Sequence, residues 1–298
     1  MQLIAYIFIY PILWLISLFP FKLLYALSDV ICFIVYRLIG YRTSTVKSNL
    51  RLVFPDKSEE EINSITKKFY SHLCDLFLEM IKTLNISRRQ LNARFILKNP
   101  EKIKALQHSE HSSILMFGHY ASYEWSIMLQ SHIDIPGLVL YKKIANSHFD
   151  HLVRRIRSKY NTELVDSKKA IGRIKELHKA NDKRMIAFLS DQSPKLRANS
   201  VWLDFMGITV PSFVGAEAVA KKYNYPIGFL KIDKVKRGHY EAEIVSLSEN
   251  PKEEPDFKIT EKFNRLLEAQ IKAKPEFYLW THKRWKHKDK APKTTNLN

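Results

Sequence analysis

Short apolar runs alternate with helix-like stretches from about residue 111 onward, and this alternation constrains the fold more than any other feature of the chain. The runs that predict strands are 112–120, 137–143, 162–167, 184–192, 227–235 and 240–247. Helical patterns occupy 121–131, 146–159, 168–180 and 213–224. Such alternation predicts an α/β fold with helices packed on the sheet. Arg237-Gly238 separates the last two strands and indicates a hairpin, so we expect a mixed central sheet flanked by helices.

The N-terminus is strongly apolar. Residues 3–21 carry no charge over 19 residues, close to the roughly 20 that cross a bilayer core. Arg37 and Arg42 follow the apolar region, and the positive-inside rule then keeps the rest of the chain cytoplasmic. We expect a membrane anchor over 1–42, and the sequence leaves open whether it spans the bilayer or lies in one leaflet. A buried hairpin of a soluble protein is the alternative.

The next stretch predicts helices. Residues 43–53 have a helical pattern, and Ser58 with Glu61 three residues later is a capping box at the start of a longer helix. The expected organisation is an anchor at 1–42, a helical region packing on the core at 43–110, the α/β core at 111–290 and a disordered tail at 291–298.

The charge indicates an anionic partner. The chain has 48 Lys+Arg against 30 Asp+Glu, a net charge of +18. Lys22, Asp29 and Arg37 are the charged residues of the first 40, which leaves +17 for the remainder. Nucleic acid, an acidic protein and an anionic membrane surface all attract such a body. No RNA-binding module is recognisable, so we expect a membrane surface and no nucleic acid. A basic nucleic-acid-binding protein and a membrane protein with a degenerate site remain alternatives.

One constellation carries chemistry. An apolar strand stops at Gly118, His119 stands at its carboxyl end, and Glu124 follows in the first turns of the next helix. Ligands of α/β sheets bind beyond the carboxyl ends of strands. We expect Glu124 to accept a hydrogen bond from His119 and so leave the other ring nitrogen as a base. On spacing alone the motif is weak, and a structural histidine is the alternative. We expect no metal site, because Cys32 and Cys74 are the only cysteines and the histidine spacing matches no standard site.

The motif and four further segments resemble a known family. FGHYASYEW resembles the H-x4-D/E motif of glycerolipid and lysophospholipid acyltransferases. The whole chain resembles the bacterial lipid A late acyltransferases, which are lauroyl and myristoyl transferases. The other matching segments are VKSNLRLVFP, YKKIANSHFDHLVRRIRSKYNTELVD, SDQSP with DFMGITVPSFVGAEAVAKKYNYPI, and PEFYLWTHKRWK.

The resemblance implies a glycerolipid-acyltransferase-like fold and a function. The protein would transfer a fatty acyl chain from an acyl thioester, most readily acyl carrier protein and otherwise acyl-CoA, to a hydroxyl of a membrane lipid such as a lipid A precursor. Another glycolipid, a phospholipid or an aminolipid is the alternative acceptor, because SDQSP departs from the family's pattern. The resemblance also implies the inner membrane, with the core on the cytoplasmic face, and requires no cofactor. The oligomeric state stays unknown.

Residue roles follow from the resemblance. His119 would be the general base and Glu124 its orienting carboxylate. Substrate binding would fall to Gly118, Lys142, Arg157, Asp191 and Gln192. The alternatives are a strand-end turn for Gly118, a solvated basic face for Lys142 and Arg157, and a loop cap for Asp191. The aromatic and basic segment 280–288 suits a membrane surface or an anionic headgroup, and its composition would also suit RNA.

Overall fold

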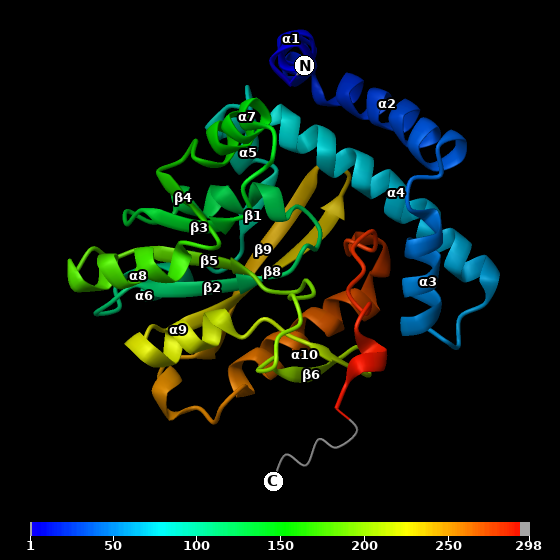
Figure 1. The fold of residues 1–298 in the computed structure, drawn as a ribbon. Coiled ribbons are helices and arrows are strands. Elements are labelled where there is room, and N and C mark those ends of the chain that lie inside the picture. The colour runs from blue at the N-terminus through cyan, green and yellow to red at the C-terminus, as the bar shows by residue number, and fades with distance from the viewer. Residues whose placement is uncertain (1, 293–298) are drawn as a thin grey trace.

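The fold centres on a mixed sheet flanked by helices, as predicted, and this sheet has seven strands (Figure 1). A computed structural model describes residues 2–292 of the chain. The strand order is β1-β9-β8-β2-β5-β3-β4, with β9 antiparallel to β8 and the other neighbouring pairs parallel. The bounds are β1 Phe95–Leu97, β2 Ser113–Phe117, β3 Gly137–Tyr141, β4 Thr162–Asp166, β5 Met185–Leu189, β8 Ile227–Lys236 and β9 His239–Ser248.

Each predicted strand is present, and the β8–β9 hairpin turns at Gly238, whose φ of +70° suits a residue without a Cβ. Two features were not predicted. Strand β1 lies inside the stretch 43–110 that was expected to be helical, and it pairs with β9 at the edge of the sheet. A second, two-stranded sheet is formed by β6 (Trp202–Phe205) and β7 (Ile208–Pro211).

Helices surround the sheet. The predicted capping box begins α4, where Ser58 and Glu61 exchange both hydrogen bonds. The helix expected at 121–131 is a 3-10 helix, η2. The bounds are α3 Thr43–Val53, α4 Glu59–Lys82, α5 Arg88–Asn92, α6 Pro100–Gln107, η2 Tyr123–Ser131, α7 Ser147–Arg157, α8 Ala170–Lys179, α9 Gly215–Tyr223 and α10 Lys258–Ala273, with single 3-10 turns at Pro251–Glu253, Pro275–Phe277 and Lys288–Lys290.

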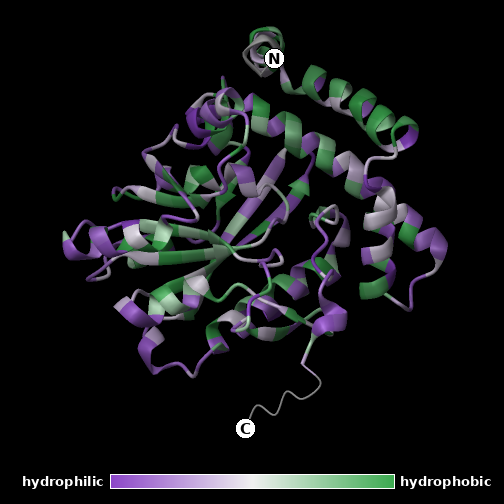
Figure 2. Ribbon diagram, viewed as in Figure 1, coloured by the Kyte–Doolittle hydropathy of each residue, from purple (hydrophilic) through white to green (hydrophobic). Residues whose placement is uncertain are grey.

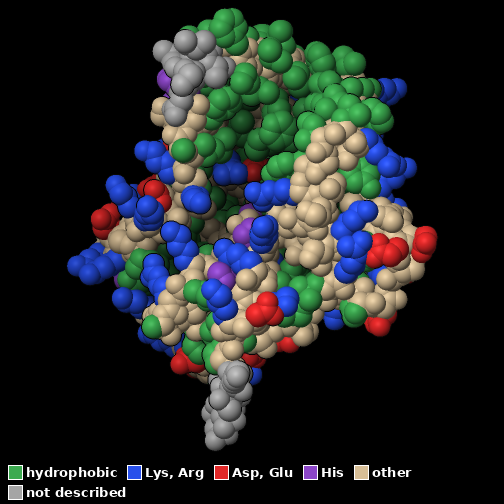
Figure 3. All heavy atoms as spheres, turned by 45° about the vertical axis from the view of Figure 1, so that its right-hand side comes forward, with side chains coloured by type: hydrophobic (Ala, Val, Ile, Leu, Met, Phe, Trp, Pro, Cys, Tyr) green, Lys and Arg blue, Asp and Glu red, His purple; other side chains and the backbone are tan. Residues whose placement is uncertain are grey.

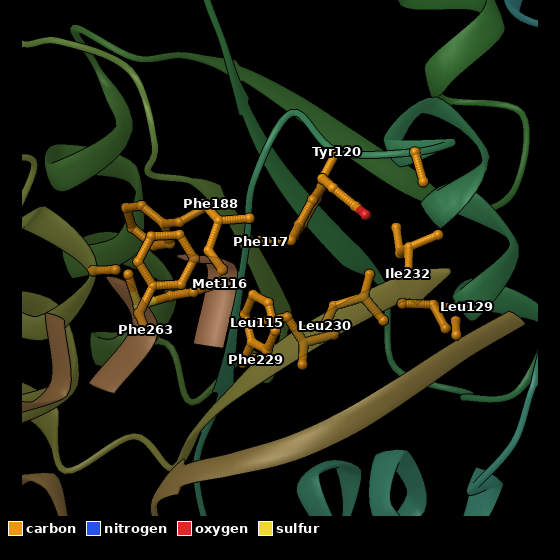
Figure 4. Packing of buried hydrophobic residues seen from close by; sticks show 14 of the residues in the cluster. Leu115, Met116, Phe117, Tyr120, Leu129, Phe188, Phe229, Leu230, Ile232 and Phe263 are labelled. Carbon is orange, nitrogen blue, oxygen red and sulfur yellow. The ribbon is translucent and has the colours of Figure 1, made fainter. Parts of the chain in front are cut away.

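The core is built around the central strand β2. Its residues are buried on both faces, as expected for a strand with parallel neighbours and helices above and below. Figure 4 shows Met116 beside Phe188 of β5 and Leu115 beside Phe229 of β8. Phe263 of α10 closes the same cluster. Burial of this strand fixes the position of the loop that follows it.

The N-terminal helices lie outside this core, along α4 (Figures 1 and 2). They are α1 (Gln2–Leu18), α2 (Phe21–Cys32) and the π-helix η1 (Phe33–Leu38). Lys82 of α4 donates to the carbonyls of Ser17 and Phe19 at 2.8 and 2.7 Å, which fixes the junction between α1 and α2.

These helices expose large apolar side chains. They include Ile7, Phe8, Ile12, Trp14, Leu15, Leu18, Val30, Phe33 and Leu38. No single helix within residues 2–292 is long and apolar enough to cross a bilayer. Phe21–Leu38 together with Thr43–Val53 meets those criteria as a pair bent by 85°. Most of the tail expected at 291–298 lies outside the described residues.

Charged groups between α2, α4 and the β8–β9 turn fasten α2 to the core. Arg237, at the β8–β9 turn, bonds to Asp75 of α4 and Asp29 of α2. The buried carboxyl of Glu79 accepts hydrogen bonds from Tyr25 of α2 and Tyr240 of β9 at 2.8 and 2.9 Å. Burial raises the pKa of Glu79 to about 7. The N-terminal helices are therefore part of the folded body.

Candidate active site

His119 is paired with Asp191. The ring nitrogen Nδ1 lies 2.7 Å from Asp191 Oδ1, and the backbone N–H of His119 donates to Asp191 Oδ2 at 3.0 Å. Asp191 is 2% exposed. Burial alone would raise the pKa of this carboxyl, but attraction to His119 and the two hydrogen bonds hold it below its usual value. An ionised carboxylate on Nδ1 favours the tautomer whose Nε2 carries a lone pair.

Strand register explains the pair. β2 and β5 are parallel neighbours in which Phe117 is aligned with Leu189. His119 and Asp191 each lie two residues beyond those positions, so the same register brings them together at the carboxyl edge of the sheet. This is the edge at which α/β proteins bind ligands.

Glu124 does not make the hydrogen bond to His119 that the sequence predicted. Its carboxylate accepts hydrogen bonds from both Nε and Nη2 of Arg157, and the distance from Nε to Oε2 is 3.0 Å. The 3-10 helix points Glu124 toward the end of α7, where a guanidinium matches a carboxylate in a bidentate pair. Asp191 therefore takes the orienting place that the sequence assigned to Glu124.

The two pairs are neighbours through Tyr123. The Tyr123 ring lies edge-on to the His119 ring at a centroid distance of 4.9 Å. Tyr123 directly precedes Glu124 in the chain, so it connects the His119–Asp191 pair to the Glu124–Arg157 pair. Burial, followed by the charge of Glu124, raises the pKa of the Tyr123 hydroxyl. Its phenol therefore stays neutral and serves as a wall of the site.

Gln192 and His282 complete the surroundings of His119. Gln192 Nε2 lies 3.2 Å from His119 Nε2, which is the ring nitrogen that does not contact Asp191. His282 Nε2 accepts the backbone N–H of Ser193 at 3.0 Å. Burial lowers the pKa of His282 to about 4, so this ring is neutral at physiological pH.

The C-terminal segment braces the loop that carries His119. The N–H of Leu279 donates to the carbonyl of His119 at 3.1 Å, and the N–H of Ala121 donates to the carbonyl of Phe277 at 3.0 Å. These bonds hold Ala121 at a φ of 48°, a left-handed value rare for a residue with a side chain. Asn49 of α3 in turn donates to the carbonyls of Trp280 and His282.

The expectation of a membrane-facing surface at 280–288 is therefore wrong for its large side chains. Trp280, Arg284 and Trp285 are 0%, 1% and 3% exposed. The Arg284 guanidinium donates to Pro211 O and Ser212 Oγ, at 2.8 and 3.3 Å. This segment packs beneath the site because its aromatic rings stack inside the protein.

Gly118 and Lys142 make no contact with the His119–Asp191 or Glu124–Arg157 side chains among the hydrogen bonds of the described residues. A Cβ on Gly118 would stand 2.7 Å from the Leu267 side chain of α10, so packing of that helix requires the glycine. Lys142 follows β3 at the same edge of the sheet and is exposed. Within the described chain no cluster of three His, Cys, Asp or Glu side chains could hold a metal ion.

Comparisons with known proteins show the family of the chain. Residues 2–287 match the family described as bacterial lipid A biosynthesis acyltransferase. The chain is 23% identical over 284 residues to the lipid A biosynthesis lauroyltransferase of Escherichia coli strain K12, covering 92% of this chain and 89% of that protein. Among solved structures, the 1-acyl-sn-glycerophosphate acyltransferase PlsC of Thermotoga maritima aligns with a TM-score of 0.39 at 12% identity, covering 84% of this chain and 95% of that one. The chain is therefore an acyltransferase and belongs to the bacterial lipid A biosynthesis acyltransferase family.

Proposed function

We propose that this protein transfers a fatty acyl chain from acyl carrier protein to a hydroxyl group of a lipid A precursor. The observation that carries the proposal is the His119–Asp191 pair at the carboxyl edge of the sheet, in a chain of this family. The similar Escherichia coli protein is named a lauroyltransferase of lipid A biosynthesis, which supports both the acyl group and the acceptor.

His119 acts as the general base in this proposal. Nδ1–H donates to Asp191, and Nε2 takes the proton of the acceptor hydroxyl while its oxygen attacks the thioester carbonyl carbon. A C–O bond forms, and the tetrahedral intermediate then collapses with cleavage of the C–S bond. The proton passes from Nε2 to the departing sulfur. The products are an ester and a thiol, and neither an acyl-enzyme nor a cofactor is needed.

Gln192 marks where the acceptor hydroxyl binds. Its amide nitrogen already contacts His119 Nε2 at 3.2 Å. A hydroxyl that gives its proton to Nε2 must occupy the same position. We therefore expect the acceptor to displace the Gln192 amide, which can then bond to the acceptor's own oxygen atoms.

Arg157 supplies a guanidinium on the same side of the site as the base, held in place by Glu124. Glu124 engages Nε and Nη2 of Arg157, and within residues 2–292 Nη1 makes no hydrogen bond. The Arg157 side chain is 27% exposed. We propose that it stabilises the oxyanion of the tetrahedral intermediate, as preorganised donors do in other acyl transfers. Glu124 then holds the guanidinium in place.

The N-terminal helices would seat this site on the inner membrane. Their exposed apolar side chains gather at one end of the molecule, above a hollow rimmed by Lys and Arg (Figure 3). An amphipathic lipid acceptor presents its hydroxyls at the same depth as such a rim. We propose that the core lies on the cytoplasmic face, where acyl carrier protein is available.

Acyl transfer from radiolabelled acyl carrier protein to extracted bacterial lipids tests the proposal. The full-length protein should label one lipid class, whose acyl number rises by one in mass spectrometry. His119→Ala should abolish the labelling, whereas His132→Ala, at the far end of η2, should preserve it. Unchanged labelling by His119→Ala would contradict the assigned base. Labelling of a phospholipid or an aminolipid instead would contradict the proposed acceptor.

A further inference from the structure

Helix α7 carries a basic hollow on its exposed face. The hollow has a volume of about 490 Å³, and its lining includes Lys143, Ser147, His151, Arg154, Arg155 and Ser158. The helical members recur at three- and four-residue spacing, which places them on one face. Leu152 and Ile156 are buried on the other face. The basic face is therefore turned away from the core.

The cations of this hollow lack acidic partners. Asp150 is its one carboxylate, and it is 5% exposed and accepts the backbone N–H of Ile144 at 2.8 Å. Within residues 2–292, Lys143, Arg154 and Arg155 form no ion pair, whereas Arg157 on the same helix is paired with Glu124. Three unneutralised positive charges around one concave site favour an anionic ligand.

The hollow lies beside the apolar surface of α1. The ring of Tyr6 stacks on His148 at a centroid distance of 5.3 Å and meets Phe149 edge-on at 5.8 Å. On the same helix, Ile7 and Phe8 are 56% and 69% exposed. When those side chains enter a membrane, the lipid headgroups lie at the level of α7.

We propose that this hollow binds the phosphate of a lipid headgroup in the membrane beneath α1. The inference rests on the proposed function only in placing α1 on a membrane. Arginine side chains bind phosphate oxygens in bidentate pairs, and the hydroxyls of Ser147 and Ser158 add donors. The volume suits a headgroup, whereas a docked protein needs a surface of about 800 Å² on each partner. The lipid would thus be held one helical turn from Arg157.

Vesicle binding by the full-length protein tests the inference. Arg154→Gln/Arg155→Gln removes two charges from the hollow, and Lys175→Gln/Lys179→Gln removes two from the exposed face of α8, away from α1 (Figure 1). Two charges near an anionic surface account for about 30-fold in affinity, so the first pair should weaken binding to vesicles of phosphatidylcholine and phosphatidic acid by more than that factor. The control pair should weaken it by less than about 3-fold.

Two comparisons identify the ligand. The Arg154→Gln/Arg155→Gln variant should lose less affinity, about 30-fold at most, for vesicles whose negative charge comes from oleate, because they attract the two charges but present no phosphate. Equal loss on both kinds of vesicle would overturn phosphate recognition. An unchanged affinity for phosphatidic acid, with a raised KM for acyl carrier protein, would identify the hollow as a protein-docking surface instead. Binding is measured without turnover, so the inference stands or falls separately from the proposed reaction.

Discussion

Replacement of Asp191 by asparagine tests the His119 base most directly. Asparagine keeps the size of the side chain and can still accept the backbone N–H of His119. It loses the carboxylate that Nδ1 faces at 2.7 Å. If its amide NH₂ turns toward Nδ1, the ring adopts the tautomer with the proton on Nε2. That tautomer cannot remove a proton from the acceptor hydroxyl.

The expected loss is large. The same substitution in a serine-protease triad lowers kcat by about 10⁴ through the same tautomer effect. Here the buried carboxylate also stabilises the imidazolium that forms as the hydroxyl is deprotonated, and a charge-assisted hydrogen bond contributes about 1.5–3 kcal/mol. We expect kcat to fall by about 10³ to 10⁴, which corresponds to roughly 4–5.5 kcal/mol of activation free energy. The KM for the acyl donor should change little, because Asp191 contacts the base rather than the donor.

Initial rates of labelled acyl transfer measure this change. Asp256→Asn is the matched control, because its carboxylate is 76% exposed. The Asp191→Asn/His119→Ala double variant should be no slower than His119→Ala alone, since the two side chains act as one unit. An Asp191→Asn protein that melts like wild type and keeps its rate within about 10-fold would refute the pairing as the source of the base.

Further predictions concern the fold and the second ion pair. Glu124→Gln removes one partner of the Arg157 pair and should lower the rate by about 10²-fold without unfolding the protein, as single-turnover rates with circular dichroism would detect; an unchanged rate would exclude the pair from the site. Gly118→Ala places a Cβ against Leu267 and should cost about 1–3 kcal/mol of stability, and the added substitution Leu267→Ala should recover activity if packing is the cause. Burial raises the pKa of Glu79 to about 7, so the folded protein keeps a proton that the unfolded chain releases near pH 4.5. The contribution of Glu79 to the free energy of unfolding should therefore fall by roughly 3 kcal/mol as pH rises through that interval. Because His282 titrates in the same interval with the opposite sign, the effect is measured as the difference between urea titrations of wild type and of Glu79→Gln.

Local patterns were sufficient to predict the strands and the place of His119. Each strand is a short apolar run bounded by turn residues, and a strand end is a local event. The partner of His119 was not predictable in this way. Glu124 is five residues away in the sequence and Asp191 is 72 residues away, yet β2 and β5 are neighbours in the sheet. Strand order is set by long-range pairing that one sequence does not display.

The C-terminal segment was misread for a related reason. Tryptophans interleaved with basic residues have the composition of an interfacial surface. Their burial depends on partners far along the chain, among them Asn49 of α3 and Phe205 of β6. The VKSNLRLVFP stretch contains that asparagine, whose amide anchors the segment that supports the His119 loop. A motif can therefore belong to a site through the backbone that it holds.

The distribution of charge follows from the geometry of the proposed reaction. An acyl chain and a lipid acceptor must meet at the depth of the headgroups, so the enzyme needs an apolar surface that sets its depth and a basic rim that retains anionic groups there. The exposed apolar residues of α1, α2 and η1 provide the apolar surface. The unpaired cations of α7 lie beside α1, and Arg157 on the same helix reaches Glu124. A chain with +1 in its first 40 residues and +17 in the rest is suited to this proposed arrangement, because charge on helices that enter a bilayer would oppose their burial there.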